Sequence, residues 1–381
     1  MNVCKIYAVV LSFLFALTAD LHCKASSSDG ASPVLSLMTC SPGDELYAAY
    51  GHSAVRLKDD SLGIDWVFNY GTFNFDTPNF YGKFLQGTLD YCLSVSPTNS
   101  FLRIYDYEGR AVVEREIILP PDERRELASL LVENSREENR YYRYDFLFDN
   151  CATRIRDIVL KAGKLQPLSG KANFSYRDCL HAYVPSSRWT GQGIDLILGM
   201  ETDYDVALDD VAMLPDSLEA YMVGRNLVSE PRLLLQRASA EDSSILSSLF
   251  SPSCVAVLLI LLFSAFSVFE YHRGTYFKWL DVCLFSVLAV LSLLFSYLWF
   301  ISEIRTTSWN WNLLWANPLA ILILISLFSR PLRRLKPIIL LNQGLILLWF
   351  VLVVFGVQFA PVLAFSLSIC SLLRCSLLLH R

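Results

Sequence analysis

The sequence predicts an α+β exported domain, built from antiparallel hairpins and helices, followed by an all-α polytopic membrane domain of about five helices. Three observations lead to this prediction. An apolar run too short to span a bilayer, Ile6–Ala19, follows Lys5, which is typical of a secretory signal. The middle of the chain mixes alternating and helical patterns of apolar residues. From about Ser253 onward, long apolar runs are separated by short charged or aromatic loops.

The signal is expected to end at residue 25, because Cys23-Lys24-Ala25 resembles a small-x-small cleavage site. Two alternatives stay open: an uncleaved anchor, and a lipoprotein signal that uses Cys23, for which the preceding His22 is a poor match. The expected organisation is a signal peptide at 1–25, an exported domain at 26–228, a polar linker at 229–250 and a membrane domain at 251–381.

The composition excludes some classes of function. The 381 residues are 53% hydrophobic and carry a formal net charge of −5, which gives no reason to expect a nucleic-acid partner. The histidines are scattered and no Cys/His ligand spacing occurs, so no metal and no organic cofactor is expected. Export makes a disulfide possible among Cys40, Cys92, Cys151 and Cys179. Their spacing leaves the pairing open, with Cys40–Cys92 and Cys92–Cys179 as candidates.

Strands dominate the first part of the exported domain. A hairpin is predicted from two alternating runs that flank the turn Asp59–Gly63. The predicted strands are Ala54–Lys58, Asp65–Phe73, Leu89–Val95 and Ile104–Val113, the last continued by Glu114–Ile118. An amphipathic helix is then expected from Pro121 to about Asn139.

The chemistry is expected to centre on Cys151. An aromatic run ends at Asp149-Asn150, a helical pattern begins, and Asn150 is a good N-cap that would place Cys151 in the first turn. A helix N-terminus favours thiolate over thiol, and its free N–H groups can hold an oxyanion. Arg154 and Arg156 are expected to add to this field. The alternative is a buried cysteine that only packs.

A base would make Cys151 a nucleophile, and His52, which opens the first strand of the hairpin, is the predicted base. A third group should orient the imidazole. Asn69 on the returning strand is the first choice for this role and Asp65 the second. Tyr50 is a further candidate hydrogen-bond donor.

Five apolar segments are each near the length that crosses the hydrocarbon: 253–269, 277–301, 311–328, 337–355 and 359–379. If the first segment enters the membrane from the outside, the loops that carry most of the Lys and Arg residues lie on the cytoplasmic side. This agrees with an exported N-terminal domain. Trp309, Trp311 and Trp315 are expected in an outer aromatic belt, and Arg374 is expected to snorkel to the inner face. No intramembrane charge chain is predicted, which argues against a pump or transporter.

The order of a strand-borne histidine followed by a helix-borne cysteine is similar to circularly permuted papain-like thiol enzymes, such as lecithin retinol acyltransferase. Three motifs carry a closer resemblance: Gly51-His52-Ser53, Asn69-Tyr70-Gly71-Thr72-Phe73, and Phe146 followed by Asp149-Asn150-Cys151. Together with the membrane helices, they resemble the Lnb family of bacterial lipoprotein N-acyltransferases. The resemblance covers the exported domain and the helical tail.

The resemblance implies a periplasmic thiol-enzyme domain on a multi-pass protein of the bacterial inner membrane. Such an enzyme moves a fatty acyl chain from a phospholipid, through a Cys151 thioester, to the N-terminal amine of diacylglyceryl-cysteine lipoproteins. Its partners are then the phospholipid donor, the lipoprotein acceptor and the bilayer. Residues of the motifs and the neighbouring polar clusters are expected to bind substrate: Tyr50, Ser53, Tyr70, Asn150, Arg154 and Arg188.

Two other functions remain open. A membrane-anchored cysteine peptidase or amidase of the cell envelope would use the same Cys151–His52 pair with water as the acceptor. A non-enzymatic sensor or scaffold would leave Cys151 structural. The sequence does not indicate acyl-chain or headgroup preference, the ester position that is cleaved, or the oligomeric state.

Overall fold

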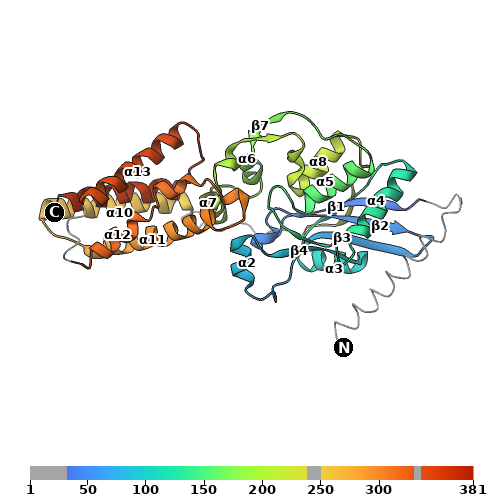
Figure 1. The fold of residues 1–381 in the computed structure, drawn as a ribbon, viewed down its shortest axis with the longest axis horizontal. Helices are drawn as coiled ribbons and strands as arrows, with labels where there is room; N and C mark the ends of the chain where they lie inside the picture. The colour runs from blue at the N-terminus through green and yellow to red at the C-terminus, as the bar shows by residue number, and fades with distance from the viewer. Residues whose placement is uncertain (1–31, 238–249, 330–335, 381) are drawn as a thin grey trace.

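A computed structural model describes residues 32–237, 250–329 and 336–380 of the chain. The predicted signal at 1–25 and most of the predicted linker lie outside the described residues. The molecule is elongated, with a sheet-containing domain at one end and a bundle of helices at the other (Figure 1). This arrangement confirms the predicted fold class.

The exported domain is built on a seven-stranded antiparallel sheet in the order β6-β4-β3-β2-β1-β5-β9. Its strands are β1 Val34–Cys40, β2 His52–Asp59, β3 Ile64–Thr72, β4 Asp90–Pro97, β5 Val112–Glu116, β6 Tyr141–Arg143 and β9 Arg232–Leu235. A separate pair is formed by β7 Lys171–Ser175 and β8 Asp205–Ala207. The predicted hairpin is therefore confirmed as β2–β3, with Val55 opposite Phe68 and Leu57 opposite Trp66.

Helices cover both faces of the sheet. The α-helices of this domain are α2 Phe80–Gln86, α3 Thr98–Tyr107, α4 Pro121–Asn134, α5 Cys151–Ala162, α6 Tyr176–His181, α7 Trp189–Ile197 and α8 Pro215–Gly224. Short 3₁₀ turns are η1 Leu46–Ala48, η2 Met200–Asp203 and η3 Asp210–Met213. Helices α4, α5 and α8 share one core with the sheet, and α3 packs on the opposite face. Alternation along β2 explains this, since Val55 and Leu57 face the first core and Ala54 faces the second.

The predicted strand at Ile104–Val113 is wrong over its first part, because Thr98–Tyr107 forms helix α3. Phe101 and Tyr105, one helical turn apart, are both buried against the sheet. A few alternating apolar and polar residues are compatible with an amphipathic helix as well as with a strand. Here the segment is a helix because its buried side chains pack against β1, β2 and β5. Helix α4 ends at Asn134 rather than near Asn139.

The sheet also extends into the region predicted as linker. Residues Arg232–Leu235 form β9 and pair with β5, so the seventh strand lies beyond the predicted domain end at residue 228. The apolar pattern in these four residues is too short for the sequence to distinguish an edge strand from a polar linker.

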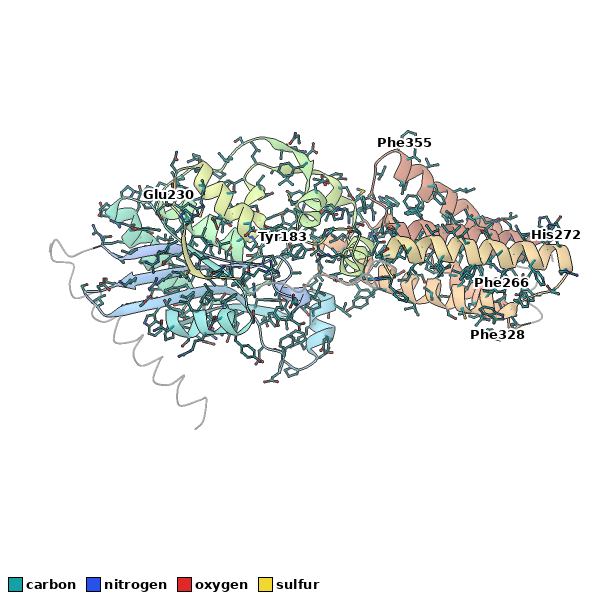
Figure 2. All side chains as sticks on the ribbon, turned by 180° about the vertical axis from the view of Figure 1, so that it is seen from behind. Tyr183, Glu230, Phe266, His272, Phe328 and Phe355 are labelled. Carbon is teal, nitrogen blue, oxygen red and sulfur yellow. The ribbon has the colours of Figure 1, made fainter. Side chains whose placement is uncertain are left out.

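The bundle contains α10 Pro252–Arg273, α11 Lys278–Phe300, α12 Leu319–Ser326, α13 Lys336–Val354 and α14 Val362–Leu379, with the 3₁₀ turns η4 Arg305–Thr307 and η5 Trp311–Leu314. Within the described residues, four of these helices are long and apolar enough to cross a membrane: α10, α11, α13 and α14. The third predicted segment is instead a short helix, α12, that begins after Asn317-Pro318. Apolar side chains are exposed along the bundle, as are Phe328 and Phe355, which are labelled in Figure 2, whereas Phe266 packs against the bundle core.

Arg374 does not snorkel as predicted. It is fully buried between helices, where Nε lies 2.5 Å from Asp281 Oδ1 and Nη2 lies 3.0 Å from Glu270 Oε2. The sequence did not reveal this buried cluster, because each of the three charged residues lies on a different helix and only packing brings them together. Trp315 is likewise buried in the bundle core and is not part of an outer belt.

The two domains are joined by direct hydrogen bonds. Gly199 N–H donates to the Thr306 carbonyl at 2.8 Å, and Gln358 donates to the Leu198 carbonyl at 3.2 Å. On the side of α2, Glu303 N–H donates to the Gln86 carbonyl at 2.8 Å. The exported domain is thus seated on one end of the bundle, whereas His272 and the C-terminal end of the chain lie at the other (Figures 1 and 2).

Candidate active site

Cys151 is the first residue of α5, and Asn150 caps this helix as the sequence predicts. The Asn150 side-chain oxygen accepts from the N–H groups of Ala152 and Thr153 at 2.8 and 3.0 Å. Its amide donates to the carbonyls of Phe146 and Met213. Buried Asn150 therefore fastens the start of α5 to two other segments and fixes the position of the thiol.

The cap changes the expected source of oxyanion donors. The N–H groups of Ala152 and Thr153, which a bare helix N-terminus would leave free, are both bound by Asn150. The backbone N–H groups of Ala152 and of Ser53 on β2 lie near the Cys151 thiol and lower its pKa. The sulfur consequently lies among backbone donors from two different elements.

His52 opens β2 beside Cys151 and hydrogen-bonds its thiol. The other side of the ring is held by β3, where Asn69 Oδ1 lies 2.5 Å from His52 Nε2. Because Nε2 is engaged with an acceptor, Nδ1 is the nitrogen left to face the sulfur. The three side chains form a line across β3, β2 and the start of α5.

The electrostatics favour an ionised pair. Burial by itself would raise the pKa of the Cys151 thiol, but the charge and hydrogen bond of His52 and the N–H groups of Ser53 and Ala152 outweigh burial and lower it. Burial would lower the pKa of His52, yet the Cys151 charge and the Asn69 hydrogen bond raise it above its ordinary value. A low thiol pKa beside a high imidazole pKa is the condition for a nucleophilic thiolate.

Gly71 shapes the wall of this site. Its φ is +89°, a backbone conformation that favours glycine, and it lies where the β3–β4 register shifts between Asn69 and Thr72. A methyl group at Gly71 would lie 3.8 Å from His52 Cε1, 3.9 Å from Cys151 Cβ and 3.7 Å from Tyr144 Cε2. The glycine therefore permits a bulge that brings the β3 backbone against Cys151 and His52.

The predicted arginines are not directed at the thiol. Arg154 forms a bidentate pair with Asp149 at 2.5 and 2.8 Å and stacks on Tyr142. Arg156 pairs with Asp157 at 2.8 Å and with Asp210 at 3.2 Å. The predicted contribution of these two charges to the thiolate is replaced by that of His52 and the backbone.

The remaining predicted residues lie in three different places. Tyr70 and Arg154 line a polar cavity of about 410 Å³ beside α5. Tyr50 is buried against Phe146, and among the described residues its hydroxyl has no hydrogen-bond partner; burial raises its pKa. Arg188 is exposed and precedes α7.

Asp65 is far along β3 from Asn69 and serves another purpose. It accepts two hydrogen bonds from Arg56, both of 2.7 Å, and one from Thr98 at 2.6 Å. These contacts hold the pKa of Asp65 below its ordinary value and leave Asn69 as the group that contacts His52.

Several residues near the site were not identified from the sequence. Cys40 pairs with His52 across β1 and β2, and burial raises its pKa to about 12, so it remains a thiol. Tyr144 and Gly71 complete the wall. The one available signal was the glycine within a strand pattern, which often marks a bulge or a close backbone approach.

The described residues contain no group of three or more His, Cys, Asp or Glu side chains placed to hold a metal ion. All eight cysteines among them are free thiols, so the candidate disulfides Cys40–Cys92 and Cys92–Cys179 are not formed.

Taken together, the fold and the site define a multi-pass membrane protein whose exported domain carries a buried Cys–His pair. Comparison with family models gives two matches, the Lnb N-terminal periplasmic domain over residues 22–181 and the Lnb transmembrane domain over residues 244–380. The chain belongs to the Lnb family, as its motifs predict, and its N-terminal domain is periplasmic. This membership indicates a membrane protein of lipoprotein processing. No curated protein and no solved structure matches the chain.

Proposed function

We propose that the protein is a lipoprotein N-acyltransferase of the inner membrane, with Cys151 as nucleophile, His52 as general base and acid, and Asn69 as the group that orients His52. The observation that carries this proposal is the line of contacts from Asn69 Oδ1 through the His52 ring to the Cys151 thiol. This is the arrangement of a thiol enzyme, in which a third residue holds the base in the useful tautomer.

In the first half-reaction, the Cys151 thiolate attacks the ester carbonyl of a phospholipid. The C–S bond forms, and the C–O bond of the ester breaks as the tetrahedral intermediate collapses. The departing lyso-phospholipid alkoxide takes the proton of the His52 imidazolium. The Ser53 N–H, which lowers the pKa of the thiol, supplies a hydrogen bond to the oxygen of the intermediate, because the Ala152 N–H is already bound by Asn150 Oδ1.

In the second half-reaction, the α-amine of a lipoprotein attacks the Cys151 thioester. His52 now accepts the amine proton, the C–N bond forms and the C–S bond breaks, which regenerates the thiolate–imidazolium pair. No oxidant, reductant or energy donor is needed, because the acyl group moves from an ester through a thioester to an amide.

The seating of the domain supports this role. Arg305, in the loop after α11, lies over the Phe148 ring at 4.8 Å, three residues before Cys151. This contact joins the segment before Cys151 to the loop after a candidate spanning helix, which supports a site near the membrane surface, where the ester of a phospholipid and the amine of a lipid-anchored protein would both lie. A restricted position raises their effective concentration.

The test is mass spectrometry of the N-terminal peptide of a lipoprotein in membranes that contain the intact protein or its Cys151→Ser form. An N-acyl mass with the intact protein alone is expected. Cys179→Ser is the matched control, because this thiol lies in the same domain and has a pKa raised to about 11 by burial. An unmodified amine in every sample, with fatty acid released instead, would favour hydrolysis over transfer.

A further inference from the structure

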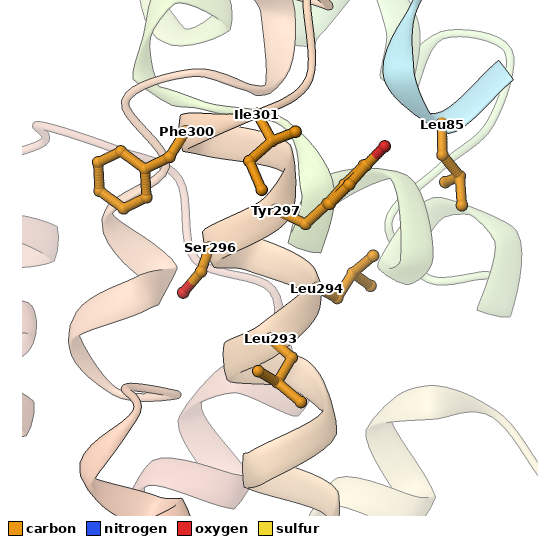
Figure 3. A pocket seen from close by; sticks show the side chains of 7 residues that line it. All are labelled: Leu85, Leu293, Leu294, Ser296, Tyr297, Phe300 and Ile301. Atoms are coloured by element: carbon orange, nitrogen blue, oxygen red, sulfur yellow. The ribbon is translucent and has the colours of Figure 1, made fainter. Parts of the chain in front are cut away.

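An apolar groove lies where the exported domain meets the bundle. It has a volume of about 600 Å³ and is bounded by Leu85 on α2 and by residues of α11, among them Leu293, Leu294 and Tyr297. In Figure 3, Tyr297 and Leu294 point from α11 toward Leu85. One wall of the groove is therefore the end of a helix that is long and apolar enough to cross a membrane.

The geometry of the groove is fixed by contacts between α2 and the segment after α11. Ser302 Oγ donates to the Leu85 carbonyl at 2.8 Å, and Glu303 N–H donates to the Gln86 carbonyl. Gly87 follows with a φ of +76°, and a methyl group there would lie 2.8 Å from Ile304 Cγ1. Only glycine combines this backbone conformation with such a close approach, so α2 is seated directly on the outer end of α11.

A series of aromatic rings leads from α2 to Cys151. Successive ring centroids are 6.3 Å apart for Phe84 and Phe80, 5.8 Å for Phe80 and Phe73, 5.3 Å for Phe73 and Tyr91, and 4.4 Å for Tyr91 and Tyr144. Tyr144 in turn lies against Gly71, which borders the thiol. The rings that begin this series are exposed or half-buried, as Phe84 is at 47% exposure.

We infer that the groove and this aromatic series bind the fatty acyl chain that is transferred, with its carbonyl at Cys151 and its tail running over α2 into the bilayer. The inference rests on the proposed function and adds the path of the donor chain. Hydrocarbon is the occupant because the groove faces lipid and the exposed rings of α2 offer apolar contact without charge. The transferred chain, rather than a chain of the acceptor, is assigned because the series ends at the sulfur that carries the thioester.

The first experiment offers the protein vesicles that hold equal amounts of long-chain and medium-chain phospholipids, and measures the masses of the N-acyl products. Leu85→Trp and Leu293→Trp narrow the groove from its two walls. Each is expected to lower the ratio of long-chain to medium-chain product roughly 10-fold, the scale on which apolar pockets discriminate by size. Leu261→Trp on α10 is the matched control, since Leu261 is 61% exposed and Leu293 is 60% exposed.

A second measurement does not depend on turnover. A phospholipid with a diazirine at the end of one acyl chain is photolysed in vesicles with the Cys151→Ser protein, and crosslinked peptides are mapped. Crosslinks on α2 and on 293–301 are expected, and they should decrease in Leu293→Trp but not in Leu261→Trp.

The outcomes separate the two proposals. If no N-acyl product appears with the intact protein while the crosslinks do, the transfer reaction fails and the groove remains a lipid site. If transfer proceeds with the same product ratio in every variant and crosslinks are spread evenly over the bundle, the path is wrong. If the bundle is labelled but α2 and residues 293–301 are not, the groove does not bind lipid and the inference is overturned.

Discussion

Asn69 Oδ1 lies 2.5 Å from Nε2 of His52, and this contact between neighbouring strands fixes the position of the imidazole ring. Asn69→Ala would remove the acceptor and leave the ring free to rotate away from Cys151. Acyl-thioester formation is expected to fall about 10²-fold, the cost of misplacing a reacting group by roughly 1 Å. Single-turnover assays with trapped acyl-enzyme measure this. Asn134→Ala is the control, because Asn134 donates to the Tyr70 hydroxyl and not to His52; an equal loss there would contradict an orienting role.

The pH dependence of alkylation should reveal the thiolate. Cys151 has a pKa below the ordinary 9.0 of a thiol, so its reaction with iodoacetamide should begin at lower pH than that of a free thiol. His52→Ala removes the lowering charge and hydrogen bond but keeps the burial, which raises the pKa, so the onset should move to higher pH. Cys179, with a pKa of about 11, provides an internal comparison by peptide mapping. An unchanged onset in His52→Ala would argue against the pair.

The Asn150 cap should matter for stability as well as for position. Asn150→Ala removes the acceptor for two N–H groups and leaves the carbonyls of Phe146 and Met213 without their donor. The expected loss in the free energy of unfolding is about 2–4 kcal/mol, from the cap and the unpaired carbonyls together. Asn150→Ser keeps a cap acceptor and should be less severe. Thermal unfolding of the full-length protein in detergent measures both, and equal losses would mean that the cap itself contributes little.

Docking of the two domains should depend on Gly199. A methyl group there would lie 1.8 Å from the Ser308 carbonyl oxygen, a backbone atom that cannot be displaced without moving the loop. Gly199→Ala should therefore break the hydrogen bond from Gly199 N–H to the Thr306 carbonyl. Protease cleavage between the domains should increase, and acyl transfer should decrease. Gly193→Ala is the control, because a methyl group at Gly193 meets no atom within 4 Å. Unaltered cleavage in Gly199→Ala would show that the contact is not needed for docking.

Arg374 should be important for the folding of the bundle. Arg374→Met leaves Asp281 and Glu270 buried without the cation that compensates them, which typically costs about 3–5 kcal/mol. The variant should lose monodispersity in detergent at lower temperature, and adding Asp281→Asn should restore part of the loss. Arg273→Met, at an exposed helix end, is the control. If the single and double variants behaved alike, the ion cluster would not carry this stability.

The hairpin, the α5 cap and the membrane half could be predicted because each is encoded locally. Alternating apolar residues predicted β2 and β3, and long apolar runs predicted the spanning helices. Asn150 before an apolar helical pattern predicted the start of α5. The Thr98–Tyr107 segment could not be predicted in the same way, because its two buried aromatic residues suit a helix or a strand until the sheet beneath them is known.

The sequence by itself determined the order of the parts: an exported α+β domain, then a polytopic bundle, with His52 opening a strand and Cys151 opening a helix. Only the tertiary structure decided which groups act on the thiol. Arg154 pairs with Asp149, Asn69 rather than Asp65 contacts His52, Gly71 lies against His52 and Cys151, and Leu85 of α2 lies beside the end of α11. The reason is physical: caps and periodic patterns are local, whereas ion pairs, strand register and the seating of one domain on another depend on residues far apart in the chain.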